Sequence, residues 1–244
     1  MAQTADPRGL PSPDLPSLKG VRLMDVEGNG PIRLLSARQQ QQVAAIAQRV
    51  QFPRRTVMYH EHARAEFIYI ISRGIIKTYR NLPSGRRRVL AFWFPEDIFG
   101  LAQAGRYVNT TQAVTDVTLF RLAIPTLKEA LAQDASLQLQ FLCKVTHELR
   151  QAQRHSIVVS RKDAVGRVAM FLRALDDQEV QRERPGVIDL PMNRADVADY
   201  LGLSAEAMSR ACRKLERNGI ISFTNRHSAR VVDARELNRL ASGA

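Results

Sequence analysis

The sequence predicts an α+β chain with three consecutive parts: a β-roll (jelly roll), one long helix, and a small C-terminal domain of short helices followed by a β-hairpin. Short β-rich runs between turn residues recur from about residue 21 to 123. A helical repeat of apolar residues follows, and the chain after residue 161 carries short helical segments with capping residues. We therefore expect a disordered tail at 1–20, the β-roll at 21–123, the long helix at 124–160 and the C-terminal domain at 161–244.

Composition limits the class of protein. A chain of 244 residues with 45% hydrophobic content can bury one or two cores. The net charge of +12 indicates a polyanionic partner, for which nucleic acid is commoner than membrane. No window reaches the roughly 18 consecutive apolar residues of a membrane span, and no signal peptide is evident, so we expect a cytoplasmic protein without membrane contact. The two cysteines, Cys143 and Cys212, encode neither a disulfide framework nor a cysteine-rich metal site.

The first two parts follow from local composition. Prolines 7, 11, 13 and 16 interrupt residues 1–20, which have few large apolar side chains to offset the entropy of ordering. The expected strands are RTVMYH (55–60), EFIYIISRG (66–74), IIKTYR (75–80), RRVLAFWF (87–94) and VTLFRL (117–122). NLPSGRR (81–87) has the residues of a hairpin turn, and Arg73-Gly74 marks another tight connection.

After Pro125 the apolar positions repeat at steps of three and four, which is the pattern of a coiled-coil seam. The seam residues are Leu142, Val145, Leu149, Ala152, Ser156 and Val159. A long helix beside a small β domain would leave this stripe in water unless a second copy covered it, so we expect a homodimer. The alternative is that the stripe packs only on its own β domain, since Phe141 and Leu142 point to different sides of the helix.

The C-terminal domain has the signals of a helix-turn-helix. DAVGRVAMFLRAL (163–175) predicts a helix; Asn193, with Asp196 three residues on, predicts the start of a second one, which Gly202 ends. Ser204 can cap the next helix, which would be the reading helix of the motif. The hairpin IISFTNRHSARVV (220–232), with its turn at 225–228, then forms a wing.

The reading helix has two faces. Met208, Cys212 and Leu215 share one face and should be core, whereas Glu206, Ser209, Arg210 and Arg213 remain for solvent or a DNA groove. A carboxylate can accept from cytosine N4, an arginine can bond guanine O6 and N7, and a serine can serve a base or a phosphate. An ordinary exposed helix with salt bridges is the alternative.

The segment LPMNRADVADYLGLSAEAMSRACRKLERNGII (190–221) resembles the helix-turn-helix of the CRP/FNR superfamily of bacterial transcription regulators. The resemblance extends to Arg73-Gly74, PEDIFG (95–100) and SRKDAVGRVAMFL (160–172). It implies a cyclic-nucleotide-binding-like β-roll, a dimerisation helix and a winged helix-turn-helix that binds double-stranded DNA, with RNA polymerase as a further partner.

The spacing of Glu206, Ser209 and Arg210 matches the E-x-x-S-R pattern of the FNR and FixK branch. This resemblance implies an inverted repeat of TTGAT-type half-sites, in which Glu206 and Arg210 carry most base discrimination and Ser209 contacts the thymine side. The expected phosphate contacts are Arg194, Arg213, Lys214 and Arg217.

The sensor part departs from the family's ligand-binding members. Cyclic-nucleotide binders carry Gly-Glu after the PxDxFG-like segment and a later Arg-Ser/Thr pair, whereas here Leu101 follows Gly100 and Arg106 is out of step. Without an arginine aimed at it, a buried cyclic phosphate would lack compensation, which argues against cyclic AMP. Residues 1–142 contain no cysteine, which argues against the [4Fe–4S] cluster of FNR itself. We expect no cofactor.

An effector in the β-roll stays open as an alternative, because some relatives bind haem or a small aromatic acid there. The nearby aromatic residues are Tyr59, Tyr69, Phe92 and Trp93, which otherwise form core. Oxidation of Cys212 on the reading helix and a symmetric disulfide through Cys143 are further possibilities, against which stand a core-facing register and a reducing cytosol.

A metal enzyme is a remote alternative. His60, His62 and Glu66 form the H-x-H-x3-E half of a cupin metal motif, which suits iron or manganese. No glycine begins the motif, since Arg54 is there, and Arg88 stands where a later histidine is needed. We therefore expect neither a metal site nor an enzyme.

Overall fold

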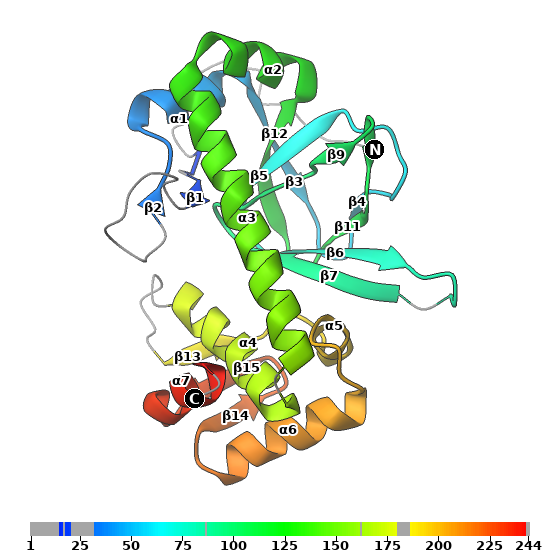
Figure 1. The fold of residues 1–244 in the computed structure, drawn as a ribbon, viewed down its shortest axis with the longest axis vertical. Helices are drawn as coiled ribbons and strands as arrows, with labels where there is room; N and C mark the ends of the chain where they lie inside the picture. Colours follow the sequence, from blue (N-terminus) through cyan, green and yellow to red (C-terminus); the bar gives the residue numbers. More distant parts are fainter. Residues whose placement is uncertain are drawn as a thin grey trace. The chain divides into compact units, whose positions relative to one another are not determined.

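The computed structural model describes residues 15–16, 18–20, 32–85, 87–161, 163–179 and 186–242 (Figure 1). The chain divides into two compact units, residues 1–152 and 153–244. The predicted β-roll forms the first unit together with the first part of a long helix, and the predicted winged helix-turn-helix lies in the second. The predicted α+β fold class is confirmed.

The β-roll consists of two four-stranded antiparallel sheets with the orders β4-β11-β6-β7 and β3-β12-β5-β8. Their strands are β3 Ala47–Phe52, β4 Val57–Tyr59, β5 Phe67–Arg73, β6 Ile76–Asn81, β7 Arg87–Trp93, β8 Ile98–Phe99, β11 Thr110–Ala113 and β12 Val117–Ala123. Two small ribbons complete the unit, β1 Lys19–Gly20 with β2 Ile32–Arg33 and β9 Ala102–Gln103 with β10 Arg106–Tyr107. All five predicted strands are present, and Figure 1 shows β6 and β7 as a long hairpin.

The predicted turns have a clear backbone reason. Gly74 between β5 and β6 has φ of +92°, and a Cβ there would lie 2.4 Å from the Asp116 carbonyl oxygen. Only glycine fits this combination of a positive φ and a close backbone approach. The β6–β7 turn likewise uses Gly85 at φ +76°.

The two sheets enclose an apolar core, and a second cluster joins this core to the helices. Ile71, Ile76, Phe99 and Leu119 are buried between the sheets. Leu137 and Phe141 of the long helix pack with Leu122 and α1 Ala37–Ile46 in the second cluster. One face of the long helix is therefore part of the core of the first unit.

The expectation of a wholly disordered tail over residues 1–20 is wrong at its end, although most of the segment lies outside the described residues. Leu15 and Leu18 are buried in the same cluster as the helices, and Lys19 and Gly20 form β1. Two leucines provide enough apolar surface to anchor this short segment despite the surrounding prolines.

The single helix expected over 124–160 is two helices, α2 Ile124–Gln133 and α3 Ala135–Arg161. Asp134 separates them in an extended conformation with φ of −135°. Its Oδ1 accepts a hydrogen bond from the Leu137 backbone N–H at 2.9 Å, so the carboxylate caps α3. The apolar repeat continues across this break, which is why periodicity alone did not reveal it.

The second unit contains α4 Ala164–Glu179, α5 Arg194–Tyr200, α6 Ala205–Arg217 and α7 Ala234–Ser242. A three-stranded sheet has the order β13-β15-β14, with β13 Val187–Asp189, β14 Ile221–Asn225 and β15 Ser228–Val231. The predicted wing is the β14–β15 hairpin, and β13 and α7 are additions that the sequence analysis did not include. The helix predicted over 163–175 is α4, and its apolar residues Val168, Ala169, Leu172 and Leu175 are buried.

Candidate nucleic-acid interface

The helix-turn-helix begins and turns where the capping residues predict. Asn193 Oδ1 accepts from the Asp196 backbone N–H at 2.7 Å, and Asn193 Nδ2 donates to Asp196 Oδ2 at 2.8 Å. Gly202 ends α5 at φ +65°. Ser204 Oγ then accepts from the Ala207 backbone N–H at 3.1 Å and caps α6. These contacts fix where each of the two helices begins and where the turn between them lies.

Arg167 of α4 supports the turn and was missed by sequence reasoning. Its Nη1 donates to the carbonyl oxygens of Leu201 and Gly202, both at 3.2 Å. A cation at the last carbonyls of a helix also interacts favourably with the helix dipole. Arg167 lies between the apolar Val165 and Val168, a position that gave no signal beyond an interrupted apolar run.

The two faces of α6 differ as predicted. Met208, Cys212 and Leu215 are buried in the core of the second unit. Glu206 and Arg210 are exposed on the other side, and Ser209 is half-buried. The structure thus brings the three predicted base-contacting residues together on the first two turns of α6, where reading helices meet base edges.

Electrostatics keep Glu206 ionised. Its own backbone N–H and the Ser204 hydroxyl lower the pKa of the Glu206 carboxyl, and the Arg210 guanidinium lowers it further. The first turn of a helix stabilises an anion in any case. An ionised Glu206 is a hydrogen-bond acceptor only, which suits the amino group of cytosine.

The four predicted phosphate contacts lie on the surface. Arg194 at the start of α5 is exposed, and its guanidinium lies over the Phe223 ring of the wing at 5.5 Å. Arg213, Lys214 and Arg217 are exposed along the later turns of α6. Arg213 Nε also donates to the Ser209 carbonyl oxygen at 3.4 Å. Their role as phosphate contacts stays a prediction.

The seam stripe is open to solvent in the single chain. Leu142 is 54% exposed, Val145 39% and Leu149 58%, and Ala152 and Ser156 are exposed as well. Val159 is half-buried. The alternative that this stripe packs on its own β domain is wrong, because that role falls to Leu137 and Phe141.

A buried ion cluster joins α3 to the PEDIFG segment of the roll. The Lys144 ammonium is completely buried, 3.0 Å from Asp97 Oδ1 and 2.6 Å from Glu148 Oε1. Burial opposes the charge on Lys144, but the two carboxylates overcome this and raise the lysine pKa. Burial and the negative charge of Asp97 raise the pKa of Glu148 to about 7. No sequence pattern predicted this cluster, in which two acidic side chains surround one basic side chain.

The aromatic residues considered for an effector site belong to the core. Tyr59 stacks on Tyr107 with ring centroids 3.7 Å apart, and Tyr69 stacks on Phe99 at 5.0 Å. Burial raises the pKa of both Tyr59 and Tyr69. Phe92 is buried and Trp93 half-buried, with its Nε1 donating to Thr78 Oγ1 at 3.2 Å.

The histidines considered as metal ligands lie on the surface. His60, His62 and Glu66 are exposed, and His62 has its side chain 76% exposed. In the described part of the chain, no three His, Cys, Asp or Glu side chains come together in a way that could hold a metal ion. None of the helices that the structure describes is long and apolar enough to cross a membrane.

Both cysteines are buried. Cys143 packs in the core of the first unit and not on the exposed stripe, which argues against a symmetric disulfide across the seam. Burial raises the pKa of the Cys212 thiol, which reduces the fraction of reactive thiolate.

Comparison with protein-family models matches residues 166–240 to the Crp-like helix-turn-helix domain and residues 49–134 to the cyclic nucleotide-binding domain. The nitrogen fixation regulation protein FixK of Azorhizobium caulinodans is 32% identical over 209 residues, which span 85% of this chain and 84% of the relative. The transcriptional activatory protein AadR of Rhodopseudomonas palustris is 31% identical over 81% of this chain and 82% of its own length.

The solved structure of FixK2 from Bradyrhizobium japonicum has a TM-score of 0.75 and 30% identity, covering 82% of this chain and 99% of that chain. These relatives and this fold are those of transcription regulators, not of enzymes. The chain therefore belongs to the CRP/FNR superfamily, in its FixK-like branch, and is a helix-turn-helix DNA-binding transcription regulator.

Proposed function

We propose that the protein acts as a homodimer that binds an inverted repeat of TTGAT-type half-sites, with Glu206, Ser209 and Arg210 reading bases. The observation that carries this proposal is the presence of these three side chains on the outward face of α6, opposite the buried Met208 and Cys212. An ionised acceptor and a guanidinium one helical turn apart can each engage one base edge. Arg194, Arg213, Lys214 and Arg217 add phosphate contacts, which contribute affinity with little sequence information.

The exposed stripe of α3 supports the proposed dimerisation. Leu142 and Leu149 expose more than half of their surface, and a second copy of the stripe would remove this apolar surface from water. A two-fold dimer reads two half-sites in successive major grooves, about 34 Å apart. The inverted symmetry of the DNA site then mirrors the symmetry of the protein.

We further propose that DNA binding requires neither cyclic AMP nor a [4Fe–4S] cluster. Arg106 is exposed, and its Nη1 donates to the His62 carbonyl oxygen at 2.8 Å, so its guanidinium lies at the surface of the roll. Leu101 occupies the position where nucleotide-binding members carry glutamate, and it is 43% exposed. Residues 1–142 contain no cysteine that could ligate a cluster. As a regulator of transcription, the protein would act with RNA polymerase in the cytoplasm.

The test is fluorescence-anisotropy binding of purified protein, without added effector, to a TTGAT-N4-ATCAA duplex and to a scrambled duplex at one salt concentration. We expect at least about a thousandfold higher affinity for the palindrome, which is the lower end of the ratio between specific and non-specific affinity in DNA-binding proteins. Equal affinity for both duplexes would contradict effector-independent reading. In that case haem and small aromatic acids would be added to find an effector that restores the preference.

A further inference from the structure

Most of the net positive charge of this DNA-binding protein lies outside its DNA-reading unit. Residues 32–123 of the β-roll contain 14 Lys and Arg against 5 Asp and Glu, a net charge of +9. Residues 153–244 contain 16 against 12, a net charge of +4. Helix α6 therefore accounts for only part of the polyanion affinity that the composition indicates.

Strand register places four of these cations in two directly opposed pairs. Arg80 is opposite Arg88 in the β6–β7 hairpin, and Arg64 is opposite Arg106 in an isolated bridge. Opposed residues of an antiparallel pair project to the same side of the sheet with Cβ atoms about 5 Å apart, where like charges are destabilising.

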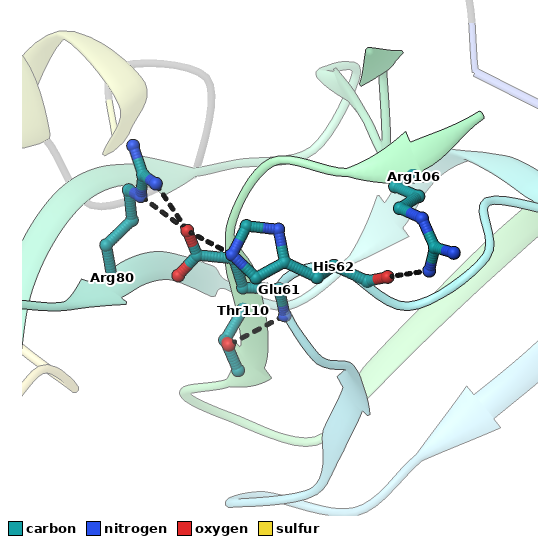
Figure 2. Close-up of polar contacts among 5 residues, drawn as sticks. All are labelled: Glu61, His62, Arg80, Arg106 and Thr110. Atoms are coloured by element: carbon teal, nitrogen blue, oxygen red, sulfur yellow. Dashed lines mark hydrogen bonds and ion pairs between the residues drawn. The ribbon is translucent and has the colours of Figure 1, made fainter. Parts of the chain in front are cut away.

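Figure 2 shows that one segment, Glu61 and His62, contacts one arginine of each pair. Arg80 Nε donates to Glu61 Oε1 at 2.7 Å, and Arg106 Nη1 donates to the carbonyl oxygen of the next residue, His62, at 2.8 Å. The Glu61 backbone N–H donates to Thr110 Oγ1 at 3.0 Å, which joins the segment to β11. Arg80 and Arg106 thus flank consecutive residues. We name Arg64, Arg80, Arg88 and Arg106 the arginine cluster.

The cluster is suited to phosphate. A guanidinium presents five N–H donors, and the contacts described above leave Arg106 with donors to spare at an exposed position. Glu61 forms an ion pair with Arg80 and orients its guanidinium. Arginine forms paired hydrogen bonds with phosphate oxygens, and 13 of the 14 cations in the roll are arginines.

We propose that the arginine cluster of the β-roll binds the phosphate backbone of duplex DNA that flanks the sequence read by α6. The proposal rests on the proposed DNA binding by the C-terminal unit, because it concerns the flanks of a duplex that α6 already holds. It assigns to the roll a direct, sequence-independent contribution to affinity.

The experiment compares Arg64→Gln/Arg106→Gln with the wild type on a duplex limited to the palindrome and on one extended by about 15 base pairs on each side. Glutamine keeps a donor for the His62 carbonyl. The variant should match the wild type on the short duplex and bind the long one about tenfold more weakly, with a smaller salt slope, because each lost phosphate contact removes about 0.9 from that slope. Its melting temperature should not fall, since the exchange relieves like-charge repulsion.

The matched control is Arg38→Gln/Arg49→Gln, which removes the same charge at exposed positions of α1 and β3. It should leave the length dependence unchanged. Equal binding of wild type and cluster variant to the long duplex would overturn the proposal. A variant that binds both duplexes normally but loses activation by purified RNA polymerase would also overturn it, because the partner would then be an acidic protein surface.

Failure of the proposed reading function gives a different result. In that case the wild type binds the palindrome and a scrambled duplex of the same length equally. The cluster variant still binds the extended form of either sequence more weakly than the wild type does, and binds the short form normally.

Discussion

Helices α3 and α6 each bury one face in their own unit and expose the other, and the two exposed faces differ in chemistry. On α3 the exposed face is apolar, with Leu142 and Leu149 in water. On α6 it is polar and charged, with Glu206 and Arg210. An exposed apolar stripe is covered by another apolar stripe, whereas an acid and an arginine at a helix start match base edges. The chemistry of the exposed face therefore indicates the partner.

The sharpest way to break this comparison is to place a charge on the apolar stripe. Leu149→Glu should separate the dimer, because two opposed carboxylates would be buried without partners. Affinity for the palindrome should fall at least about 100-fold, since one half-site contributes far less than two linked ones. Light scattering gives the mass, and anisotropy gives the affinity.

Gln151→Glu is the control, because it adds the same charge at an exposed position of α3 outside the seam. It should remain dimeric. A Leu149→Glu protein that stays dimeric and binds DNA normally would show that the stripe is not the interface.

The second prediction concerns the polar face of α6. Arg210→Ala should cost about 1–3 kcal/mol in binding free energy and flatten the preference at one base pair. Lys214→Ala should weaken all sequences alike and lower the salt slope by about one. Anisotropy against duplexes substituted at single positions separates the two effects. If both variants lost affinity equally on every sequence, the assignment of base and phosphate roles would be wrong.

The buried faces of the two helices also differ, and pH distinguishes them. The buried face of α6 is apolar, whereas α3 buries Lys144 with Asp97 and Glu148. Because the Glu148 pKa is raised from 4.5 to about 7, the folded state binds more protons than the unfolded chain in this interval. The stabilisation from protonated Glu148 is complete below about pH 4.5 and is lost as pH rises through about 7.

Glu148→Gln should remove this part of the pH profile and raise the free energy of unfolding at pH 8 by about 1–2 kcal/mol. The glutamine carbonyl still accepts from Lys144, and Asp97 still balances its charge. Urea unfolding at pH 5 and pH 8 measures the effect. Glu129→Gln on the exposed side of α2 is the control, and an unchanged profile for Glu148→Gln would refute the assignment.

Sequence patterns predicted the C-terminal unit more completely than the β-roll, for a physical reason. Asn193, Gly202 and Ser204 act within four residues of their own position, so their signals are local. Strand β3 was not predicted because half of the residues in its sequence AQRVQF are polar and none is fully buried, and it is a strand because β12 pairs with it. Such a segment forms a strand because another strand, distant in the sequence, pairs with it.

In the candidate sites too, local features were predictable from the sequence and tertiary contacts were not. The residues on α6 were predictable because helical periodicity alone separates Arg210 from Met208. The Lys144 cluster and the opposed arginines were not, because Asp97 and Lys144 are 47 residues apart and Arg64 meets Arg106 only through loop pairing. Polar groups that meet through tertiary register leave no periodic signal in the sequence.

The smallest expected effect concerns Cys212, which lies on the buried face of α6, the helix proposed to read DNA. Burial raises the pKa of its thiol, so thiolate is scarce at neutral pH and peroxide reacts slowly. Brief peroxide treatment should change affinity for the palindrome by less than about twofold, and Cys212→Ala should show the same insensitivity. Rapid loss of binding in the wild type that Cys212→Ala abolishes would mean that this face of α6 opens to solvent. The buried face of α6 would then be exposed to solvent in a fraction of the molecules, and its two faces would differ less than the structure indicates.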